Sequence, residues 1–278
     1  MSLDHGLMEL INVDAWEKYQ TPVYTIPPKE LPEPTVQHKI SICTTCMNRA
    51  SDIKQTYEQN LQDNMDYTNL EFVLLNYGSS DDLDVWVFKT LLPYIRAGKL
   101  NYYHTSEPVY YSMTHSRNIA FKLAAGAIVN NVDADHYTNP DFASYINALA
   151  NFYPAKPVFV KSKQKNRGRL GMFKQEFMAL GGYDESIESY GFDDHDLLMR
   201  AFHTGSQVVR FGGEYMRITE DHRRHPTGNY KIPDWRYTQR RNSLISLLNL
   251  HHQRYQANEN HHWGRAHLIK NFSEELDI

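Results

Sequence analysis

The sequence predicts an α/β protein built on a mostly parallel, doubly wound sheet. Apolar runs typical of buried strands alternate with amphipathic helical segments over residues 39–153, and turn-forming residues separate them. This alternation favours strand–helix–strand units with right-handed crossovers. Sheets of this kind bind ligands at the carboxyl ends of their strands, so we expect functional residues in the loops that follow the strands.

The first elements follow a proline-rich start. Residues 1–38 are expected to form an extended arm, because five prolines block regular structure from residue 21 onward. They are Pro22, Pro27, Pro28, Pro32 and Pro34.

From residue 39 the alternation is regular, and strands and helices are predicted in turn. The predicted strands are 40–43, 70–75, 100–104 and 127–132, and the helices are 51–62, 81–96 and 114–125. Ser51 or Asp52 is expected to cap the first helix, and Asp81 or Asp82 the second. Gly126 is expected to end the third.

The pattern is less regular in the second half. Pro140 is expected in the first turn of a helix that ends near Tyr153. Strands are predicted at 158–160, 208–211 and 215–218, and helices at 174–180, 193–202 and 236–253. Residues 166–171 are expected to form a loop. No internal repeat is visible.

Composition excludes some classes of protein. With 278 residues and a net charge of −4, the chain has no global positive field that would attract nucleic acid. No apolar run approaches the roughly 20 residues that span a bilayer. The first residues do not resemble a secretory signal, so we expect a cytoplasmic protein, with peripheral contact at the inner face of a membrane left open.

Asp133 and Asp135 are the first candidate site. They follow the predicted strand 127–132, and two carboxylates at a strand end can bind one hard divalent cation. The alternative is an Asx turn or a helix cap before Pro140. A second acidic group, Asp193, Asp194 and Asp196, begins a predicted helix. Helix capping explains one of these, and a spare carboxylate there could act as a general base.

Histidine and cysteine supply two further candidates. His222 could be a third metal ligand as a neutral imidazole, although a charged surface loop explains it as well. Cys43 and Cys46 are spaced as in dithiol redox motifs, which gives thiol–disulfide oxidoreductase as a rival class. Against this, neither aromatic residues nor proline flank the pair in the manner of such motifs, and a buried Cys43 is the simpler explanation.

Taken in order, several segments resemble the GT-A glycosyltransferases, most closely family 2. The segments are residues 40–49, 72–82, 116–120, 132–135, 181–185 and 191–196. The resemblance covers about 39–230, and its second half is similar to the galactosyltransferase and polypeptide N-acetylgalactosaminyltransferase groups. It implies a Rossmann-like, mostly parallel central sheet with a smaller acceptor-side region. It divides the chain into the arm 1–38, a catalytic domain 39–230 with a nucleotide-binding half 39–135 and an acceptor-binding half 136–230, and a C-terminal helical extension 231–278.

The resemblance assigns roles to individual residues. Asp194 is the implied catalytic base, and Asp133, Asp135 and His222 are the implied ligands of Mn²⁺ or Mg²⁺. The residues implied to contact the nucleotide-sugar donor are Thr44, Thr45, Asn48, Arg49, Asn76, Gly78, Ser79, Arg117 and Asp133. Implied acceptor contacts are Gly182, Tyr183, Asp193 and Asp196. Asn76 departs from the family pattern, which commonly has an aspartate there that holds uracil.

The implied activity is metal-dependent, inverting transfer of a hexose or N-acetylhexosamine. The donor is a nucleotide-diphosphate sugar, with a UDP-sugar favoured, and the acceptor is a hydroxyl of a carbohydrate or lipid-linked oligosaccharide. By family analogy the role is surface polysaccharide synthesis. A non-catalytic nucleotide-sugar or carbohydrate binding protein on the same fold is the alternative. The sequence leaves open the donor sugar, the linkage, the choice between His222 and His225 as ligand, and the oligomeric state.

Overall fold

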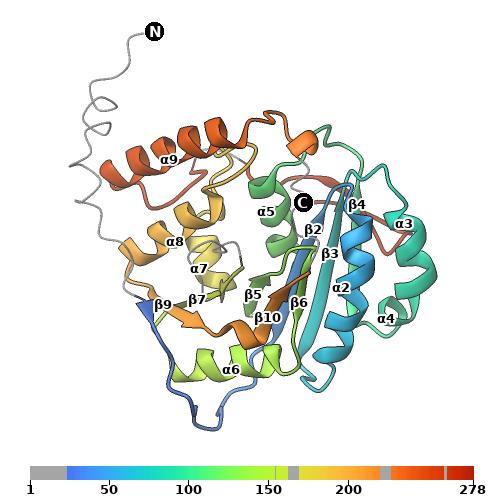
Figure 1. Ribbon diagram of the computed structural model, residues 1–278, viewed down its shortest axis with the longest axis horizontal. Coiled ribbons are helices and arrows are strands. Elements are labelled where there is room, and N and C mark those ends of the chain that lie inside the picture. The colour runs from blue at the N-terminus through green and yellow to red at the C-terminus, as the bar shows by residue number, and fades with distance from the viewer. Residues whose placement is uncertain (1–23, 154, 162–168, 220–226, 260–261) are drawn as a thin grey trace.

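The computed structural model describes residues 24–153, 155–161, 169–219, 227–259 and 262–278. A ten-stranded sheet in the order β1-β9-β7-β8-β5-β2-β3-β4-β11-β12 forms its centre, and β10 pairs with β6 separately (Figure 1). The strands are β1 (Tyr24–Thr25), β2 (Ile40–Cys46), β3 (Leu70–Tyr77), β4 (Leu100–Thr105), β5 (Ile128–Asn131), β6 (His136–Thr138), β7 (Pro157–Lys161), β8 (Leu170–Phe173), β9 (Gln207–Phe211), β10 (Met216–Ile218), β11 (His267–Lys270) and β12 (Glu274–Asp277).

The strand directions confirm a mostly parallel sheet. β2 is parallel to β3 and β5, β3 is parallel to β4, and β9 is parallel to β1 and β7. β8 lies antiparallel between β5 and β7, and β11 lies antiparallel between β4 and β12. Within this sheet, only β8 and β11 therefore run against the others. The carboxyl ends of β2, β3, β4 and β5 consequently meet at one edge.

Helices cover both faces of the sheet (Figure 1). They are α2 (Ala50–Asp63), α3 (Leu83–Trp86), the π-helix η2 (Val87–Leu91), α4 (Leu92–Arg96), α5 (Met113–Leu123), α6 (Phe142–Phe152), α7 (Lys174–Ala179), α8 (Asp193–His203) and α9 (Trp235–His251), with 3-10 turns η3 (Gly213–Tyr215) and η4 (Thr227–Asn229).

Two apolar cores form because β2 turns alternate side chains to opposite faces. Ile40, Ile42 and Cys46 join the core beneath α2, α3 and α6. Cys43 joins the core beneath α5, α7 and α8, on the other face. α9 contacts α8 and forms an outer layer there. This double winding leaves the edge at the carboxyl ends of the strands free to carry a site.

The start of α2 differs from the prediction. Arg49 is the N-cap residue and makes no side-chain cap, so neither Ser51 nor Asp52 caps this helix. Asp81 serves instead, since its carboxylate accepts hydrogen bonds from Ala50 N at 2.8 Å and from Leu83 N at 3.3 Å. The carboxylate of Asp81 thus accepts hydrogen bonds from backbone N–H groups at the beginnings of both α2 and α3.

The predicted helix 81–96 is divided into α3, η2 and α4. Pro93 lies in the first turn of α4 and has no N–H to give to the preceding turn. The backbone widens into the π-helix η2 just before it. The continuous helix was predicted because the apolar period is maintained through Val87 and Leu91, which are both buried.

Four strands of the main sheet, β1, β8, β11 and β12, were not predicted. β8 includes Leu170 and Gly171, which were expected to lie in a loop. β11 and β12 form a hairpin that extends the sheet beyond β4, so the segment 231–278 contributes strands as well as the helix α9. In the expected arm, Tyr24–Thr25 form the short edge strand β1.

Candidate active site

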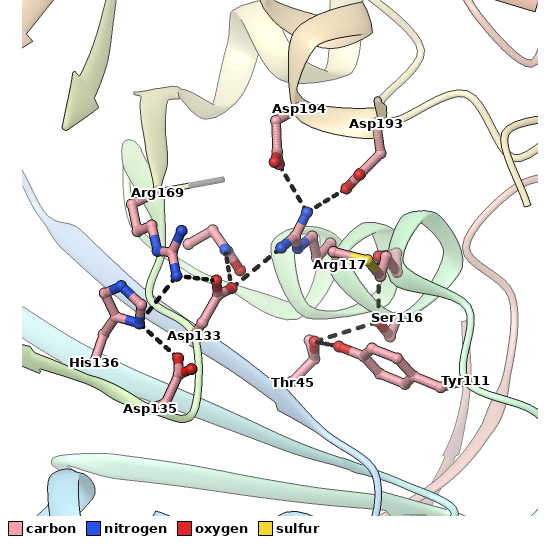
Figure 2. A network of polar contacts seen from close by, with 12 residues as sticks. Thr45, Tyr111, Ser116, Arg117, Asp133, Asp135, His136, Arg169, Asp193 and Asp194 are labelled. Atoms are coloured by element: carbon pink, nitrogen blue, oxygen red, sulfur yellow. Dashed lines mark hydrogen bonds and ion pairs between the residues drawn. The ribbon is translucent and has the colours of Figure 1, made fainter. Parts of the chain in front are cut away.

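The loop after β5 brings Asp133, Asp135 and His136 together (Figure 2). Each offers an oxygen or nitrogen atom that could bind a metal ion, and these atoms lie within 4.8 Å of one another. Asp135 and His136 share a hydrogen bond of 2.7 Å. Asn131, the last residue of β5, donates a hydrogen bond of 2.8 Å to Asp133. The end of the strand therefore fixes the orientation of this group.

His136 is fully buried at the start of β6. Its Nδ1 atom lies 2.7 Å from Asp135 and 3.2 Å from Arg169, and it cannot donate to one and accept from the other. The shorter contact, to an anionic acceptor, assigns the proton to Nδ1. Burial lowers the pKa of the imidazole, which keeps it neutral and suited to metal binding. Nε2 has no hydrogen-bond partner among the described residues.

Three arginines contact the two aspartates. Arg49 lies 3.2 Å from Asp135, and Arg117 and Arg169 each lie 3.1 Å from Asp133. Burial opposes ionisation of Asp133, but the charges of Arg169 and Arg117 outweigh it and hold its pKa well below the usual range. Burial also opposes ionisation of Asp135, but its hydrogen bond with His136 and the charge of Arg49 help to lower its pKa to about 2, so both carboxylates are anionic at neutral pH.

Arg117 connects this loop to the beginning of α8 (Figure 2). It lies in α5, and its side chain is only 2% exposed. Its guanidinium group bonds Asp133, Asp194 at 2.7 Å, and Asp193. Its charge also lies 5.6 Å from the centre of the Tyr183 ring. The family resemblance implies that Arg117 contacts the nucleotide-sugar donor. The structure places its side chain between Asp133 on one side and Asp193 and Asp194 on the other.

Asp194 faces this arginine from the first turn of α8. The turn before it is unusual, because Gly191 and Phe192 both have positive φ angles, of 95° and 73°. Burial, and then the negative charge of Asp193, raise the pKa of Asp194 to about 7. A carboxylate of this kind is basic enough to accept a proton near neutral pH.

A second group of the predicted residues gathers at the end of β3. The amide of Asn76 accepts a hydrogen bond from Ser79 N at 2.9 Å and donates to Asp84 at 2.8 Å. Asn48 accepts from Ser80 N at 2.7 Å and donates through its own backbone N–H to Ser79 Oγ at 3.0 Å. Gly78 completes this turn with a φ of 74°. These residues shape the edge of the sheet next to the acidic cluster.

Asp84 carries polar contacts that sequence reasoning missed. It accepts hydrogen bonds from Tyr102 and, at 2.9 Å, from His104. Burial opposes ionisation, but these hydrogen bonds lower the pKa of Asp84 to about 2. The turn after β3 is thereby tied to β4.

The two threonines at the end of β2 are partly engaged within the protein. Thr45 Oγ1 lies 2.7 Å from the hydroxyl of Tyr111 and accepts a hydrogen bond of 3.3 Å from Ser116 (Figure 2). Thr44 is buried in the strand. Tyr111 and Ser116 thus join the predicted residue Thr45 to the helix that carries Arg117.

All four residues with implied acceptor contacts, Gly182, Tyr183, Asp193 and Asp196, are buried in the fold. Asp196 is fully buried and pairs with Arg200 at 2.8 Å. Arg200 also donates to the carbonyl of Gly182 at 2.8 Å, and Tyr183 is fully buried. In this structure Gly182 and Asp196 hold α8 against the loop before it through Arg200, and their implied contact with an acceptor stays a prediction, as does that of Tyr183.

His222 and His225 lie outside the described residues, so their proposed role has no structural description. Two members of the cluster escaped sequence reasoning. His136 directly follows Asp135, and a ligand search that extended one residue beyond the D-x-D pattern would have included it. Arg169 lies in a segment expected to be a loop, and its sequence gives no signal of contact with Asp133.

The cysteines do not form a redox pair. Cys43 and Cys46 are buried free thiols that belong to opposite cores of the sheet. Burial raises the pKa of Cys46 to about 12 and that of Cys43 well above its usual value. Neither thiol forms the thiolate that disulfide exchange requires, which argues against the oxidoreductase interpretation.

Comparison with known proteins identifies the class. Residues 41–214 match glycosyl transferase family 2. Since this is well over half of the chain, the protein belongs to that family and is a glycosyltransferase. No curated protein matches the sequence.

Solved structures share the fold. The mannosyltransferase PcManGT from Pyrobaculum calidifontis, in complex with GDP-Man and Mn²⁺, is 19% identical with a TM-score of 0.61, over 89% of this chain and 72% of that one. S. aureus TarS 1-349 with UDP-GlcNAc is 16% identical with a TM-score of 0.58, over 76% and 67%. Glucosyl-3-phosphoglycerate synthase from Mycobacterium tuberculosis, with Mn²⁺, UDP and glucosyl-3-phosphoglycerate, is 13% identical with a TM-score of 0.52, over 77% and 79%.

The described helices include none long and apolar enough to cross a membrane. The detailed likeness of the second half to the polypeptide N-acetylgalactosaminyltransferase groups stays an expectation.

Proposed function

We propose that the protein transfers a hexose or N-acetylhexosamine, with inversion, from a nucleotide-diphosphate sugar to a carbohydrate hydroxyl. One observation carries this proposal: a cluster of metal-binding character, Asp133, Asp135 and His136, lies across Arg117 from Asp194, a carboxylate whose pKa is about 7. Inverting transfer needs both a charged site for the leaving diphosphate and a base for the acceptor. A part in surface polysaccharide synthesis is proposed by analogy with the family.

The cluster suits Mn²⁺ or Mg²⁺. Two ionised carboxylates and a neutral imidazole form a donor set of two oxygens and one nitrogen, which manganese accepts readily. Asp133, Asp135 and either His136 or His222 would hold the ion. A divalent ion there would supply positive charge for the diphosphate leaving group.

Asp194 is the proposed base. Its carboxylate would accept the proton of the acceptor hydroxyl as the oxygen attacks the anomeric carbon. The guanidinium group of Arg117 bonds the carboxylates of both Asp194 and Asp133, and so holds these two anionic groups close to each other. Asp193, which bonds the same guanidinium group, would be near the acceptor.

A UDP-sugar is the proposed donor, and the turn of Asn48, Asn76 and Ser79 is its proposed nucleoside site. Relatives of the same fold bind UDP, UDP-GlcNAc or GDP-Man. Both ends of the Asn76 amide are engaged within the turn. The nucleoside base would therefore be recognised through the backbone and neighbouring side chains of this turn.

The first experiment is a thermal-shift titration with UDP, GDP and their common sugar conjugates, with and without Mn²⁺. A ligand that binds the native state alone raises the unfolding midpoint by mass action. We expect one nucleotide class to stabilise the protein only when Mn²⁺ is present, and Asp135→Asn to abolish that shift. Asp66→Asn, at an exposed position outside the site, is the matched control.

Three outcomes decide the proposal. Metal-dependent stabilisation together with release of UDP or GDP from the sugar conjugate supports a transferase. Stabilisation with no release in the presence of any acceptor would favour a binding protein. No stabilisation by any nucleotide with Mn²⁺ present would overturn the assignment of the donor site.

A further inference from the structure

A cavity of about 670 Å³ lies between Phe192 and the first two turns of α9. Gln239 of α9 packs against Gly191, so that a Cβ atom at Gly191 would lie 3.6 Å from its side chain. The cavity therefore borders the turn that leads into Asp193 and Asp194. α9 itself lies outside residues 41–214, the segment that matches the family.

Two aromatic side chains line this cavity and are accessible from outside. Trp235 is 42% exposed and Tyr237 is 56% exposed, which is unusual for such large rings. Arg236 lies over the ring of Trp235, with its charge 4.8 Å from the ring centre. Exposed rings of this type offer an apolar face together with a polar edge, which matches the alternating surface of a sugar.

The charge of the cavity is positive. Arg236 and Arg240 line it, and in the described part of the chain neither contacts a carboxylate. Asp234 also lines the cavity, so the two arginines leave one net positive charge; its carboxylate caps α9 and accepts hydrogen bonds from the N–H groups of residues 236 and 237 at 3.0 and 3.2 Å. The helix dipole disfavours a cation in the first turn of a helix, so Arg236 does not serve to stabilise α9.

We propose that this cavity is an acceptor subsite for an anionic glycan, one that bears phosphate or carboxylate groups. The inference rests on the proposed function and adds to it the chemical class of the acceptor. Guanidinium groups bind either anion through paired hydrogen bonds. The aromatic rings would stack on sugar units, and the cavity would hold a part of the chain away from the reacting hydroxyl.

The shape of the site favours a glycan over a lipid surface. Its volume falls within the range of about 300–1,000 Å³ that is common for ligand sites. A surface that binds a membrane presents its aromatic and basic residues outward on a flat or convex face. Here the rings and arginines border an open hollow between α9 and Phe192.

The test is calorimetric titration of the full-length protein with three probes. They are tetragalacturonic acid, a mannopentaose bearing a 6-phosphate, and neutral maltotetraose. We expect at least one anionic probe to bind tenfold or more tightly than maltotetraose. The double variant Arg236→Gln/Arg240→Gln should lose that preference, and Trp235→Ala should weaken both charged and neutral probes. Arg96→Gln/Arg254→Gln makes the same charge change at exposed positions elsewhere and should bind like the wild type.

Every result bears on the proposal. Whichever anionic probe binds better identifies phosphate or carboxylate as the recognised group. Equal binding of charged and neutral probes, no binding of any, or no effect of the double variant would overturn it. Arginine-dependent sedimentation with phosphatidylglycerol vesicles, without binding of the oligosaccharides, would instead assign the face to a membrane.

A separate measurement distinguishes this inference from the proposed function. Stabilisation by nucleotide and Mn²⁺ should depend on Asp135 and should be unchanged in the double variant Arg236→Gln/Arg240→Gln. If that stabilisation persists while the oligosaccharides fail to bind, only the acceptor subsite is wrong. If it is absent, the donor assignment fails regardless of the glycan result.

Discussion

Position 117 shows how a single side chain can organise two acidic groups. The guanidinium group of Arg117 lies between Asp133 on one side and Asp193 and Asp194 on the other. Without it, three carboxylates would lie close together with little water around them, and each would oppose ionisation of the others. The buried arginine therefore allows the acidic loop after β5 and the two carboxylates at the start of α8 to lie close together.

We expect Arg117→Met to lower the free energy of unfolding at pH 8 by about 3–5 kcal/mol, the usual cost of breaking a buried ion pair. Loss of the cation raises the pKa values of the carboxylates it leaves unpaired. The difference in unfolding free energy between the wild type and the variant should therefore become smaller as the pH falls from 8 to 5.5. Urea unfolding in EDTA at both pH values measures this. The role of Arg117 would be contradicted if the loss of unfolding free energy were equal at pH 8 and pH 5.5. It would also be contradicted if the exposed control variant Arg96→Met showed the same loss.

Asp194→Asn should lower kcat by about 10²–10⁴-fold, because general-base catalysis contributes that much. The amide keeps the shape of the side chain and can still lie beside Arg117. Donor affinity should stay within a factor of two, as measured by metal-dependent thermal shift. Near wild-type turnover would show that another group accepts the proton.

The pKa of about 7 also predicts a pH profile. A base must be ionised to act, and its pKa is raised, so kcat/KM for the donor should rise with pH through about 7 and level off above it. A bound divalent ion would move this limb to lower pH by favouring the ionised form. Stopped assays from pH 5.5 to 9 at saturating Mn²⁺ would show the limb at or below pH 7, and a limb that Asp194→Asn leaves unchanged would exclude Asp194 as the base.

Among the secondary-structure elements, α9 supports residues 188–191, the turn that leads into α8. Asn242, which is fully buried, donates hydrogen bonds to the carbonyls of Glu188 and Gly191 at 3.0 and 2.8 Å. Thr238 donates to the carbonyl of Tyr190 at 2.9 Å. The turn that places Asp194 is therefore held from outside the segment that matches the family.

Asn242→Ala should lower kcat by tenfold or more with little change in the KM for the donor. It leaves two carbonyls without their donor, which costs about 1–3 kcal/mol for each buried group. Steady-state kinetics and thermal unfolding together measure the two effects. Arg254→Ala, at an exposed position beyond the helix, is the control. A rise in donor KM at constant kcat would assign α9 a different role.

The elements also show what the sequence could predict. Asp133 and Asp135 were found because they follow an apolar strand, and Asp194 because it begins a helix. β11 and β12 were missed, because residues 267–277 are short and carry charges on their exposed positions. The contact of Arg169 with Asp133 depends on the pairing of β8 with β5, and such pairing between distant segments leaves no local pattern.

At the scale of the whole molecule, the segment that matches the family is not a complete structural unit. Leu268 of β11 belongs to the core beneath α5, α7 and α8, and Leu247 and Leu250 are buried in α9, which contacts α8. The hairpin β11–β12 also covers the edge of β4, which would otherwise present unpaired backbone groups.

A chain that ends at residue 230 should therefore lose cooperative unfolding or aggregate. Its exposed apolar surface and bare strand edge both favour association. Size-exclusion chromatography and thermal unfolding of the shortened and full chains would test this. A monomer that unfolds at the same temperature as the full chain would show that α9 and the hairpin are dispensable for folding.

The two cysteines have a practical consequence. The chain contains only Cys43 and Cys46, and both lie inside the sheet with thiols that resist ionisation. The native protein should therefore be almost inert to maleimide reagents at neutral pH. One cysteine placed on the surface would then be the sole point of attachment for a fluorophore or spin label. Movements of α9 during turnover could be followed in this way without first removing the natural thiols.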